Sequence, residues 1–304
     1  ADVWIDPRKV LDHDGSGYIT SLRAAICEAT RDGARIINMS VEIDPHFLEP
    51  PYEENYTLLK GAIDFAAAHG VLLVAAGSNS FGNGVWYPAR FDEVMAVAAT
   101  TIDDGLPQQP SYGPQGSELD IAAPGGDAIN PVLSLWSSST AAQGNCSGNG
   151  RYLIVDKGAY YCAQFGTSVA SPHVAGAAAL LMALHPTLSA KDTRTILEST
   201  AHRNGLPEES VGAGILDTAA AVRAIIPKQL IPLPPVWGAT VKAGAAPFTQ
   251  TFVLANPSLQ PLHVSGQVVS DGMWAHALPG ENTPFDVKIQ HGHPAFLSVV
   301  ISPT

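Results

Sequence analysis

Short apolar runs that alternate with helical stretches constrain the fold of this chain more than any other feature. The runs are RIINMSV (35–41), GVLLVAAG (70–77), EVMAVAAT (93–100) and LDIAAP (119–124). Strands that are apolar almost throughout are typical of a parallel sheet, because both faces of such a sheet are buried. Between the first two runs, residues 54–70 carry apolar side chains at helical spacing and end on a glycine. The pattern predicts an α/β fold whose parallel sheet is covered by helices on both faces.

The composition changes near residue 226 and predicts three parts. Residues 1–225 are expected to form the α/β core. Residues 226–238 carry four prolines, which is typical of a stiff, extended linker. Residues 239–304 show alternating patches broken by turn residues, which predicts a small antiparallel, β-sandwich-like module. Three further core helices are expected at 167–185, 189–201 and 214–225.

The charge balance disfavours several classes of partner. The formal net charge is −12, so nucleic acid and anionic membrane surfaces are poor partners. No apolar run approaches the roughly 20 residues of a membrane span. The longest run, 174–184, fits a buried helix. No signal peptide is visible and the chain starts without Met, so we expect processing or a fragment of a longer protein.

Two of the three cysteines flank a hairpin-like insertion. A disulfide between Cys146 and Cys162 would close a loop of about 15 residues and stabilise the fold by roughly 3 kcal/mol. The alternative is a pair of reduced thiols. Cys27 lies in a helical pattern and is expected to be a buried apolar residue. The disulfide would indicate an oxidising compartment and therefore an extracellular protein.

The segment GTSVASPH (166–173) stands at the expected start of a helix and contains a candidate nucleophile, Ser168. A helix N-terminus offers free backbone N–H groups and a partial positive charge. These groups can stabilise the negative oxygen that forms when a hydroxyl attacks a carbonyl carbon. Thr167 and Ser168 are also ordinary N-cap residues, but the longer segment favours a nucleophile over a simple cap.

Five segments, in order along residues 1–225, resemble core blocks of the subtilisin-like serine peptidases. GTSVASPHVAGAAALL resembles the block with the nucleophilic serine, and LLVAAGSNS resembles the strand that leads to the oxyanion-hole asparagine. The other three segments are ARIINMSVE, WYPARFDEVMAVAAT and GSELDIAAPGG. The resemblance implies a three-layer subtilisin-like core and a secreted serine hydrolase. Such an enzyme transfers an acyl group from a peptide to water through an acyl-Ser168 intermediate.

The resemblance also implies which residues line the substrate cleft. Ser40 and Val41 match its floor, Ala75, Ala76 and Gly77 match one pocket wall, and Gly15 and Gly17 match the loop of the other wall. His173 matches a buried structural histidine of the family. It is not expected to act as a base, because five positions along a helix it points away from Ser168.

Two positions depart from the family pattern. The family reads Ala-Gly-Asn, but here Ser78 stands between Gly77 and Asn79. A one-residue bulge would restore Asn79 as the oxyanion donor, and Ser78 is the alternative donor. Loss of such a donor typically lowers the rate by about two to three orders of magnitude. Glu42 stands where the family usually has glycine, and its carboxylate either disfavours acidic substrates or points to solvent.

The aspartate and histidine that complete the family's catalytic triad are not found. Their motifs, Asp-x-Gly and His-Gly-x-His, normally precede the five segments, and neither is found at that place. Three interpretations stay open: a fragment whose pair preceded Ala1, a protein with a substitute base, or a non-catalytic relative that binds peptides. The aspartate strand of the family lies inside the sheet, so its absence leaves a gap or makes residues 2–11 pair with residues 35–41. An open sheet edge favours a homo-oligomer or a second chain that completes the sheet.

His13 is the candidate for a substitute base. It lies at the expected cleft edge between Asp12 and Asp14, either of which could orient its ring. The alternative is a solvated loop histidine, and His46 is a weaker candidate for the base. A serine without a base is a poor nucleophile. Such a site would retain activity on esters more than on peptides, because esters have better leaving groups than amides.

No cofactor is expected to be required. Calcium is common in the family, and a weak site formed by carbonyl groups near residues 88–94 stays an alternative. The His-x-His pair at 291–293 lacks a third ligand, so no metal site is expected there.

Overall fold

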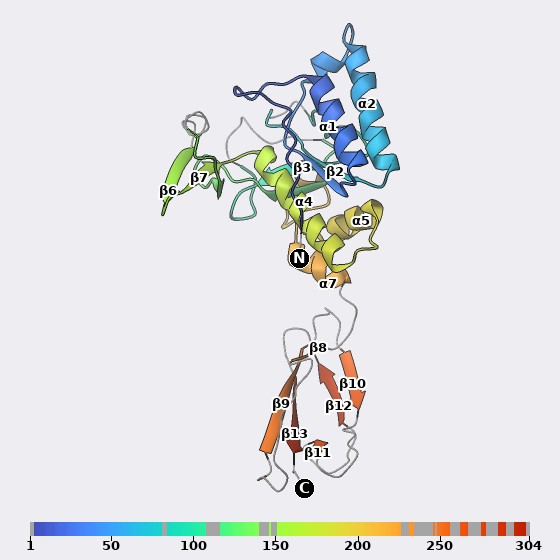
Figure 1. Cartoon of the computed structure of the whole chain (residues 1–304), viewed down its shortest axis with the longest axis vertical. Coiled ribbons are helices and arrows are strands. Elements are labelled where there is room, and N and C mark those ends of the chain that lie inside the picture. The colour runs from blue at the N-terminus through green and yellow to red at the C-terminus, as the bar shows by residue number, and fades with distance from the viewer. Residues whose placement is uncertain are drawn as a thin grey trace. The chain divides into compact units, whose positions relative to one another are not determined.

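The computed structural model describes most of the core and, in the C-terminal part, mainly strands. The described residues are 3–80, 84–107, 116–139, 146, 151–225, 231–233, 246, 248–255, 262–266, 275–277, 285–289 and 295–301. The chain divides into two compact units, residues 1–221 and 222–304 (Figure 1).

The core unit is built on a parallel sheet of four strands. β1 (Ile36–Met39), β2 (Leu72–Ala76), β3 (Val94–Thr100) and β4 (Ile121–Pro124) pair in that order. Each strand comes from one of the four apolar runs, and every residue of β2 and β3 is buried. The parallel sheet predicted from those runs is therefore confirmed.

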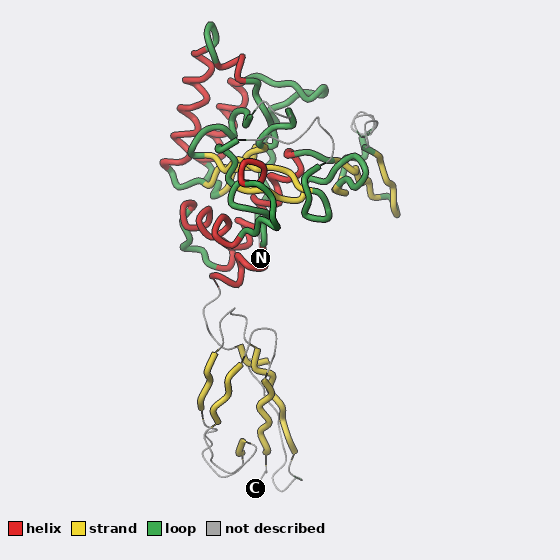
Figure 2. The backbone as a smooth tube through the Cα atoms, turned by 180° about the vertical axis from the view of Figure 1, so that it is seen from behind, coloured by secondary structure: helices red, strands yellow, loops and turns green. Residues whose placement is uncertain are grey.

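Helices cover both faces of this sheet. α1 (Ile19–Arg31) and α2 (Glu53–Ala68) lie side by side on one face. α4 (Thr167–Leu184) lies on the other face, and α5 (Ala190–Thr200) packs against it (Figures 1 and 2). Successive strand residues point to opposite faces, so Leu73 and Ala75 of β2 join the core that includes Ile63 of α2. Shorter helices are η1 (Pro45–Leu48), α6 (Glu208–Val211) and α7 (Thr218–Ile225).

α4 is the central helix of the core. Its residues Ala170, Val174 and Leu181 are fully buried. By length and composition alone α4 could cross a membrane, but it packs against all four strands of the parallel sheet, as a core helix does. Pro172 lies inside this helix, where it cannot donate a hydrogen bond to the carbonyl of Ser168 four residues earlier.

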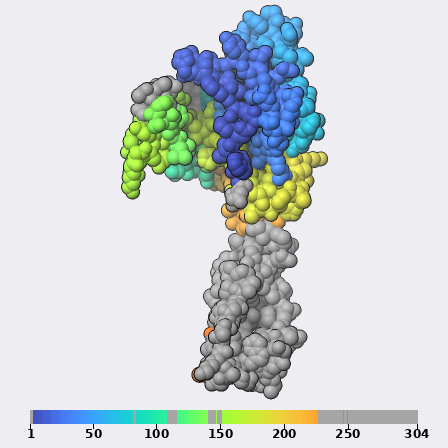
Figure 3. Space-filling view, in the orientation of Figure 1, coloured from blue at the N-terminus to red at the C-terminus, as the bar shows by residue number. Residues whose placement is uncertain are grey.

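Residues 3–18 form neither a helix nor a strand, so of the two alternatives for the missing strand, the described residues show the gap and no pairing with residues 35–41. Within the described chain, β1 pairs with β2 alone and keeps one open edge. Trp4 and Ile5 are 97% and 86% exposed. A short apolar run gains little from an extended conformation when no sheet neighbour buries its side chains. Figure 3 shows these first residues, in dark blue, on the surface of the core unit.

A small antiparallel sheet leads into α4. β5 (Val132–Leu135), β6 (Tyr152–Asp156) and β7 (Ala159–Gln164) form it in the order β5-β7-β6. β6 and β7 project from the side of the core unit (Figure 1). The predicted disulfide between Cys146 and Cys162 is confirmed, with Cα atoms 5.8 Å apart. Cys27 is half-buried in α1 and packs against the core.

The C-terminal unit has six described strands in two antiparallel sheets. They are β8 (Ile231–Leu233), β9 (Phe248–Ala255), β10 (Leu262–Gly266), β11 (Ala275–Ala277), β12 (Phe285–Ile289) and β13 (Ala295–Ile301). One sheet has the order β11-β13-β9-β8, and the other pairs β10 with β12. Two antiparallel sheets agree with the expected β-sandwich-like module. β8 lies inside the range expected to be a linker, while 226–230, 234–238 and the His-x-His pair at 291–293 lie outside the described residues.

Candidate active site

Ser168 is the second residue of α4 and stands at the carboxyl edge of the parallel sheet. Gly166, which precedes the helix, donates its backbone N–H to the carbonyl of Gly125, in the loop after β4, at 3.0 Å. The hydroxyls of Ser40, just beyond β1, and Ser171 in α4 lie 3.1 Å apart. These contacts tie the first turns of α4 to the ends of β1 and β4. Ser168 itself is half-buried, so a ligand can reach it from solvent.

Asn79 lies beside this turn and is held by Thr167. The side-chain oxygen of Asn79 accepts hydrogen bonds from the Thr167 N–H at 3.0 Å and from the Thr167 hydroxyl at 3.2 Å. A backbone N–H can only donate, so the amide must turn its oxygen toward Thr167. The amide nitrogen has no hydrogen-bond partner among the described residues. A fixed N–H donor therefore lies next to Thr167, the immediate neighbour of Ser168.

Ser78 is the extra residue between Gly77 and Asn79. Its φ of 145° is one that residues with a side chain rarely adopt. The side chain is fully buried, and its hydroxyl accepts a hydrogen bond from the Ser80 N–H at 2.9 Å. The Gly77 N–H still donates to the carbonyl of Val97 in β3, at 2.9 Å. The bulge is thus confined to Ser78, and the geometry favours Asn79 over Ser78 as the oxyanion donor.

Two glycines allow the close fit around Asn79. Gly166 has a φ of 131°, and a Cβ there would lie 2.9 Å from the side-chain oxygen of Asn79. A Cβ on Gly125 would lie 2.8 Å from the carbonyl oxygen of Gly166 and would collide with the side chain of Ala99. The turn that carries Ser168 can therefore approach Asn79 because both positions lack a side chain.

The other residues assigned to the substrate cleft differ in exposure. Residues 75–77 are buried at the end of β2, so they support the site from beneath and do not present side chains to solvent. Val41 is half-buried and packs against the core. Glu42 is exposed, and its carboxylate accepts a hydrogen bond from the backbone N–H of Asn79 at 2.9 Å. Glu42 therefore contacts the residue that holds the candidate oxyanion donor.

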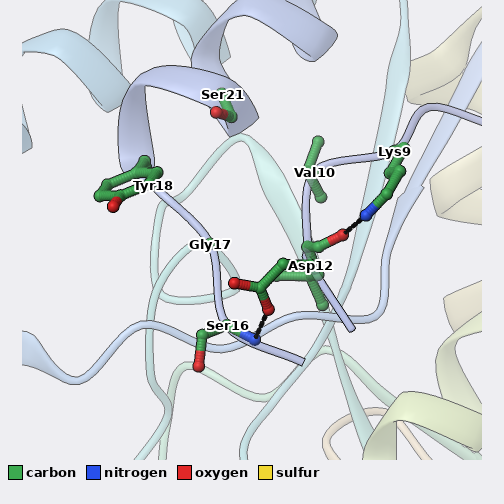
Figure 4. Close-up of a pocket in the computed structure, with 8 residues that line it drawn as sticks. Lys9, Val10, Asp12, Ser16, Gly17, Tyr18 and Ser21 are labelled. Carbon is green, nitrogen blue, oxygen red and sulfur yellow. Dashed lines mark hydrogen bonds between the residues drawn. The ribbon is translucent and has the colours of Figure 1, made fainter. Parts of the chain in front are cut away.

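Gly15 and Gly17 lie in an exposed N-terminal loop, and Gly17 lines a shallow hollow (Figure 4). The hollow has a volume of about 220 Å³ and is lined by Lys9, Val10, Leu11, Asp12, Ser16, Gly17, Tyr18 and Ser21. None of these lining residues belongs to the turn that carries Ser168. The hollow therefore does not join the N-terminal loop to Ser168.

His13 lies in the same loop, and its side chain is 90% exposed. Its Nδ1 is 3.7 Å from the carboxylate of Asp14. A side-chain hydrogen bond between the two carboxyl groups lowers the pKa of Asp12 and raises the pKa of Asp14. The high exposure of the His13 side chain is the one expected of a solvated loop histidine. Ligand atoms of Asp12, His13 and Asp14 lie within 4.8 Å of one another, a donor set that could hold a divalent cation.

Among the described residues the Ser168 hydroxyl has no hydrogen-bond partner, so none of the described histidines accepts its proton in this structure. His46 is exposed and its ring packs against Phe47, with centroids 5.6 Å apart. His173 is also exposed, so its predicted burial is wrong; its Nδ1 donates to the carbonyl of Val169 at 2.9 Å. The reason is its place on a solvent-facing stripe of α4, with Pro172, Gly176 and Leu180.

Sequence patterns do not predict three contacts of this site. Two of them, Thr167 with Asn79 and Ser171 with Ser40, involve residues of the segment 166–173, which also contains Ser168. That segment therefore contributes Thr167 and Ser171 to the candidate site as well as Ser168. The third contact joins Glu42 to Asn79, and its only sequence signal is the departure from the family's glycine at position 42.

Comparison with known proteins supplies the family. The family model described as "Subtilase family" matches residues 2–214. Subtilisin DY of Bacillus licheniformis is 36% identical over 219 residues, which are 71% of this chain and 66% of that protein. Subtilisin Savinase of Lederbergia lenta is 34% identical over 215 residues, again 71% and 66% of the two chains. An alkaline protease of Shouchella clausii is 34% identical over 215 residues, which are 71% of this chain and 47% of that protein.

Solved structures agree with this result. The crystal structure of a lanthipeptide protease is 25% identical with a TM-score of 0.54, and the match covers 72% of this chain and 70% of that one. A protease of Pseudoalteromonas arctica PAMC 21717 is 27% identical with a TM-score of 0.55, covering 69% and 59%. The chain spans 66% of the length of the two subtilisins and 47% of the alkaline protease. Because the family model covers well over half of its length, the chain belongs to the subtilase family.

Proposed function

We propose that this protein is a serine hydrolase that transfers an acyl group from a peptide to water through an acyl-Ser168 intermediate. The observation that carries the proposal is the anchored amide of Asn79 beside a half-exposed Ser168 at the start of α4. The names of the relatives, which are subtilisins and proteases, support the same reaction class.

In the proposed reaction, the Oγ of Ser168 attacks the carbonyl carbon of the substrate, and the carbonyl oxygen becomes negatively charged. The side-chain N–H of Asn79 and the backbone N–H of Ser168, near the positive end of the α4 dipole, are the donors for this oxygen. The tetrahedral intermediate collapses, and the amine leaves with a proton while the acyl group stays on Ser168. Water then attacks the acyl group, releases the acid and restores the hydroxyl.

The proton of the Ser168 hydroxyl requires a base. His13 is the base proposed within this chain, with Asp14, 3.7 Å from its Nδ1, or Asp12 as the residue that orients its ring. A positioned base typically contributes about 10²–10⁴ to the rate. Substitution of His13 therefore tests this part of the proposal separately from the role of Ser168.

A second candidate function is ester hydrolysis. The observation that favours it is that the Ser168 hydroxyl has no hydrogen-bond partner within the described residues. When the base is poorly placed, acylation depends more strongly on the leaving group, and an activated ester has a better one than a peptide. The third alternative is a protein that keeps the site and binds peptides without cleaving them.

Labelling with a fluorophosphonate separates these functions, because it reacts rapidly only with an activated serine. We expect the full chain to be labelled at Ser168, and Ser168→Ala to be unlabelled. Ser199→Ala, which removes an exposed hydroxyl on α5, is the matched control and should label like the wild type. Equal labelling of the wild type and Ser168→Ala would overturn the proposal and favour a binding protein. Assays of matched peptides and activated esters then distinguish the two hydrolase functions.

We also propose that the protein works outside the cell, and the Cys146–Cys162 disulfide supports an oxidising compartment. The open edge of β1 supports pairing with another chain, as a homo-oligomer or through a second polypeptide. Neither the reaction nor the donors named above require a cofactor, and weak calcium binding near residues 88–94 stays a proposal. Alkylation of intact protein with and without reductant tests the disulfide, and sedimentation tests the oligomer.

A further inference from the structure

We propose that Glu42 is a positioning residue that holds the backbone of Asn79 so that its side-chain amide faces the acyl group attacked by Ser168. This inference rests on the proposed function and goes beyond it. It assigns a role to a side chain that the proposed reaction does not use.

The bulge at Ser78 creates the need for such a residue. β2 ends at Ala76, so Asn79 lies three residues beyond the last strand residue and is not held by the sheet ladder. The intervening Ser78 has a φ of 145°, a conformation that a residue with a side chain keeps only when its surroundings impose it. Asn79 therefore requires an anchor outside β2.

Glu42 supplies that anchor from the neighbouring strand. β1 and β2 are parallel and Met39 pairs with Ala75, so the segments that follow the two strands leave the sheet side by side. Glu42 lies three residues past the end of β1, and its Oε2 accepts the Asn79 N–H at 2.9 Å. A hydrogen bond to a carboxylate is stronger than one between neutral groups. The segment after β2 thus contains the extra residue Ser78, and the segment after β1 contains Glu42, whose side chain is long enough to reach Asn79.

Asn79 is consequently held at two points by different elements. Glu42 binds its backbone, and Thr167 of α4 binds its side-chain oxygen through two hydrogen bonds. With both anchors present, the remaining amide N–H has one orientation relative to Ser168. Without Glu42, the segment can turn about the bulge while the Thr167 contacts are strained or lost.

A double-mutant cycle tests this role. We expect Glu42→Ala to lower the rate constant of fluorophosphonate labelling by about tenfold or more, because small displacements of a catalytic group have large effects. Glu42→Gln keeps an acceptor oxygen and should retain most of the rate. In the Asn79→Ala background, Glu42→Ala should have no further effect. Glu49→Ala, which removes another exposed carboxylate of the same segment, is the matched control.

Amide hydrogen exchange gives a second measurement that does not depend on reactivity. The Asn79 N–H should exchange at least several-fold faster in Glu42→Ala than in the wild type and Glu49→Ala. Unchanged exchange, or a loss of labelling that persists in full in the Asn79→Ala background, would overturn the positioning role. If the wild type is not labelled at all, the proposed function fails, while the exchange rates still decide whether Glu42 holds Asn79.

Discussion

The parts of the chain assigned to oxyanion binding and to proton transfer differ sharply in how they are held. The oxyanion side, made of β2, the loop after β4 and the start of α4, is buried and closely packed. The N-terminal side, residues 3–18, has no strand or helix, and it exposes Trp4 almost completely and His13 by 90%. The groups that would stabilise charge are thus attached to buried elements of the core, whereas the proposed base lies in an exposed loop.

This difference follows from hydrogen-bond partners. The oxyanion side uses contacts between residues far apart in the sequence, such as Asn79 with Thr167. The turn around His13 is closed by local contacts, such as the Asp12 carboxylate with the N–H groups of Asp14 and Ser16 at 3.3 and 3.1 Å. Local contacts close a turn without fixing it to the core. Rigid preorganisation is therefore expected on the oxyanion side alone.

Substitution of His13 is expected to have the largest effect on the labelling rate of Ser168, and it tests whether the N-terminal side takes part in catalysis. If His13 is the base, His13→Ala should lower the labelling rate of Ser168 by about 100- to 10,000-fold. His185→Ala, which removes an exposed histidine that is no candidate for the base, should leave the rate unchanged. The measurement is the second-order rate constant for a fluorophosphonate. Equal rates for the two variants would remove His13 from the mechanism and leave the N-terminal side without a catalytic role.

Substitution of Asn79 is expected to have the next largest effect. Asn79→Ala removes the anchored donor and should lower the labelling rate by about 100- to 1,000-fold. Ser78→Ala removes a buried hydroxyl that is bound to the Ser80 N–H, and it should change the rate far less. The same labelling assay measures both variants. A larger loss of labelling rate in Ser78→Ala than in Asn79→Ala would mean that Ser78 is the donor.

Unfolding measurements should show the same contrast in stability. Leu73 is fully buried in β2, so Leu73→Ala should lower the free energy of unfolding by about 2–5 kcal/mol. Trp4 is 97% exposed, so Trp4→Ala should change it by less than about 0.5 kcal/mol. Denaturant titration of both variants measures the difference. A large loss for Trp4→Ala would show that the N-terminal segment is part of the cooperative unit after all.

The smallest expected effect concerns Arg8, which pairs with Asp6, Asp32 and Glu28 and so joins the N-terminal segment to α1. Hydrogen bonds to Asp32 and then to Asp6 raise the pKa of Arg8. The pairs are exposed, so Arg8→Ala should only speed chymotrypsin cleavage at Trp4 or Tyr18 by a few-fold at low salt. Arg23→Ala, on the exposed face of α1, is the control. A difference that persists in high salt would contradict a purely electrostatic anchor.

The sequence predicts the buried parts of this molecule well, because burial leaves a pattern along the chain. Four apolar runs became four strands, and the segment around Ser168 became the start of α4. Residues 3–11 did not take up the alternative of pairing with residues 35–41, because an apolar run forms a strand only beside a neighbour that buries it. The expected burial of His173 was also wrong. Whether a residue of α4 is buried depends on which other element packs over it, and the sequence of α4 alone does not predict that.

The contacts that define the site are harder to predict. Glu42 and Asn79 are 37 residues apart, and Asn79 and Thr167 are 88 apart. The periodicity of apolar residues does not predict such pairs, because each pair depends on which strands and helices become neighbours in the fold. The resemblance to a family pointed to Asn79 and Ser168, but the role proposed for Glu42 required the three-dimensional structure.

Laboratory evolution of this site should keep Gly125 and Gly166, because they let the turn that carries Ser168 approach Asn79. Saturation mutagenesis at Gly125 or Gly166 should return mostly misassembled clones, because any added carbon meets an oxygen or a methyl group already in place. Position 41, which is half-buried and is the proposed floor of the cleft, is a better target for a library that seeks new substrates. The smallest residues of the site thus set the limit on how far its chemistry can be redesigned.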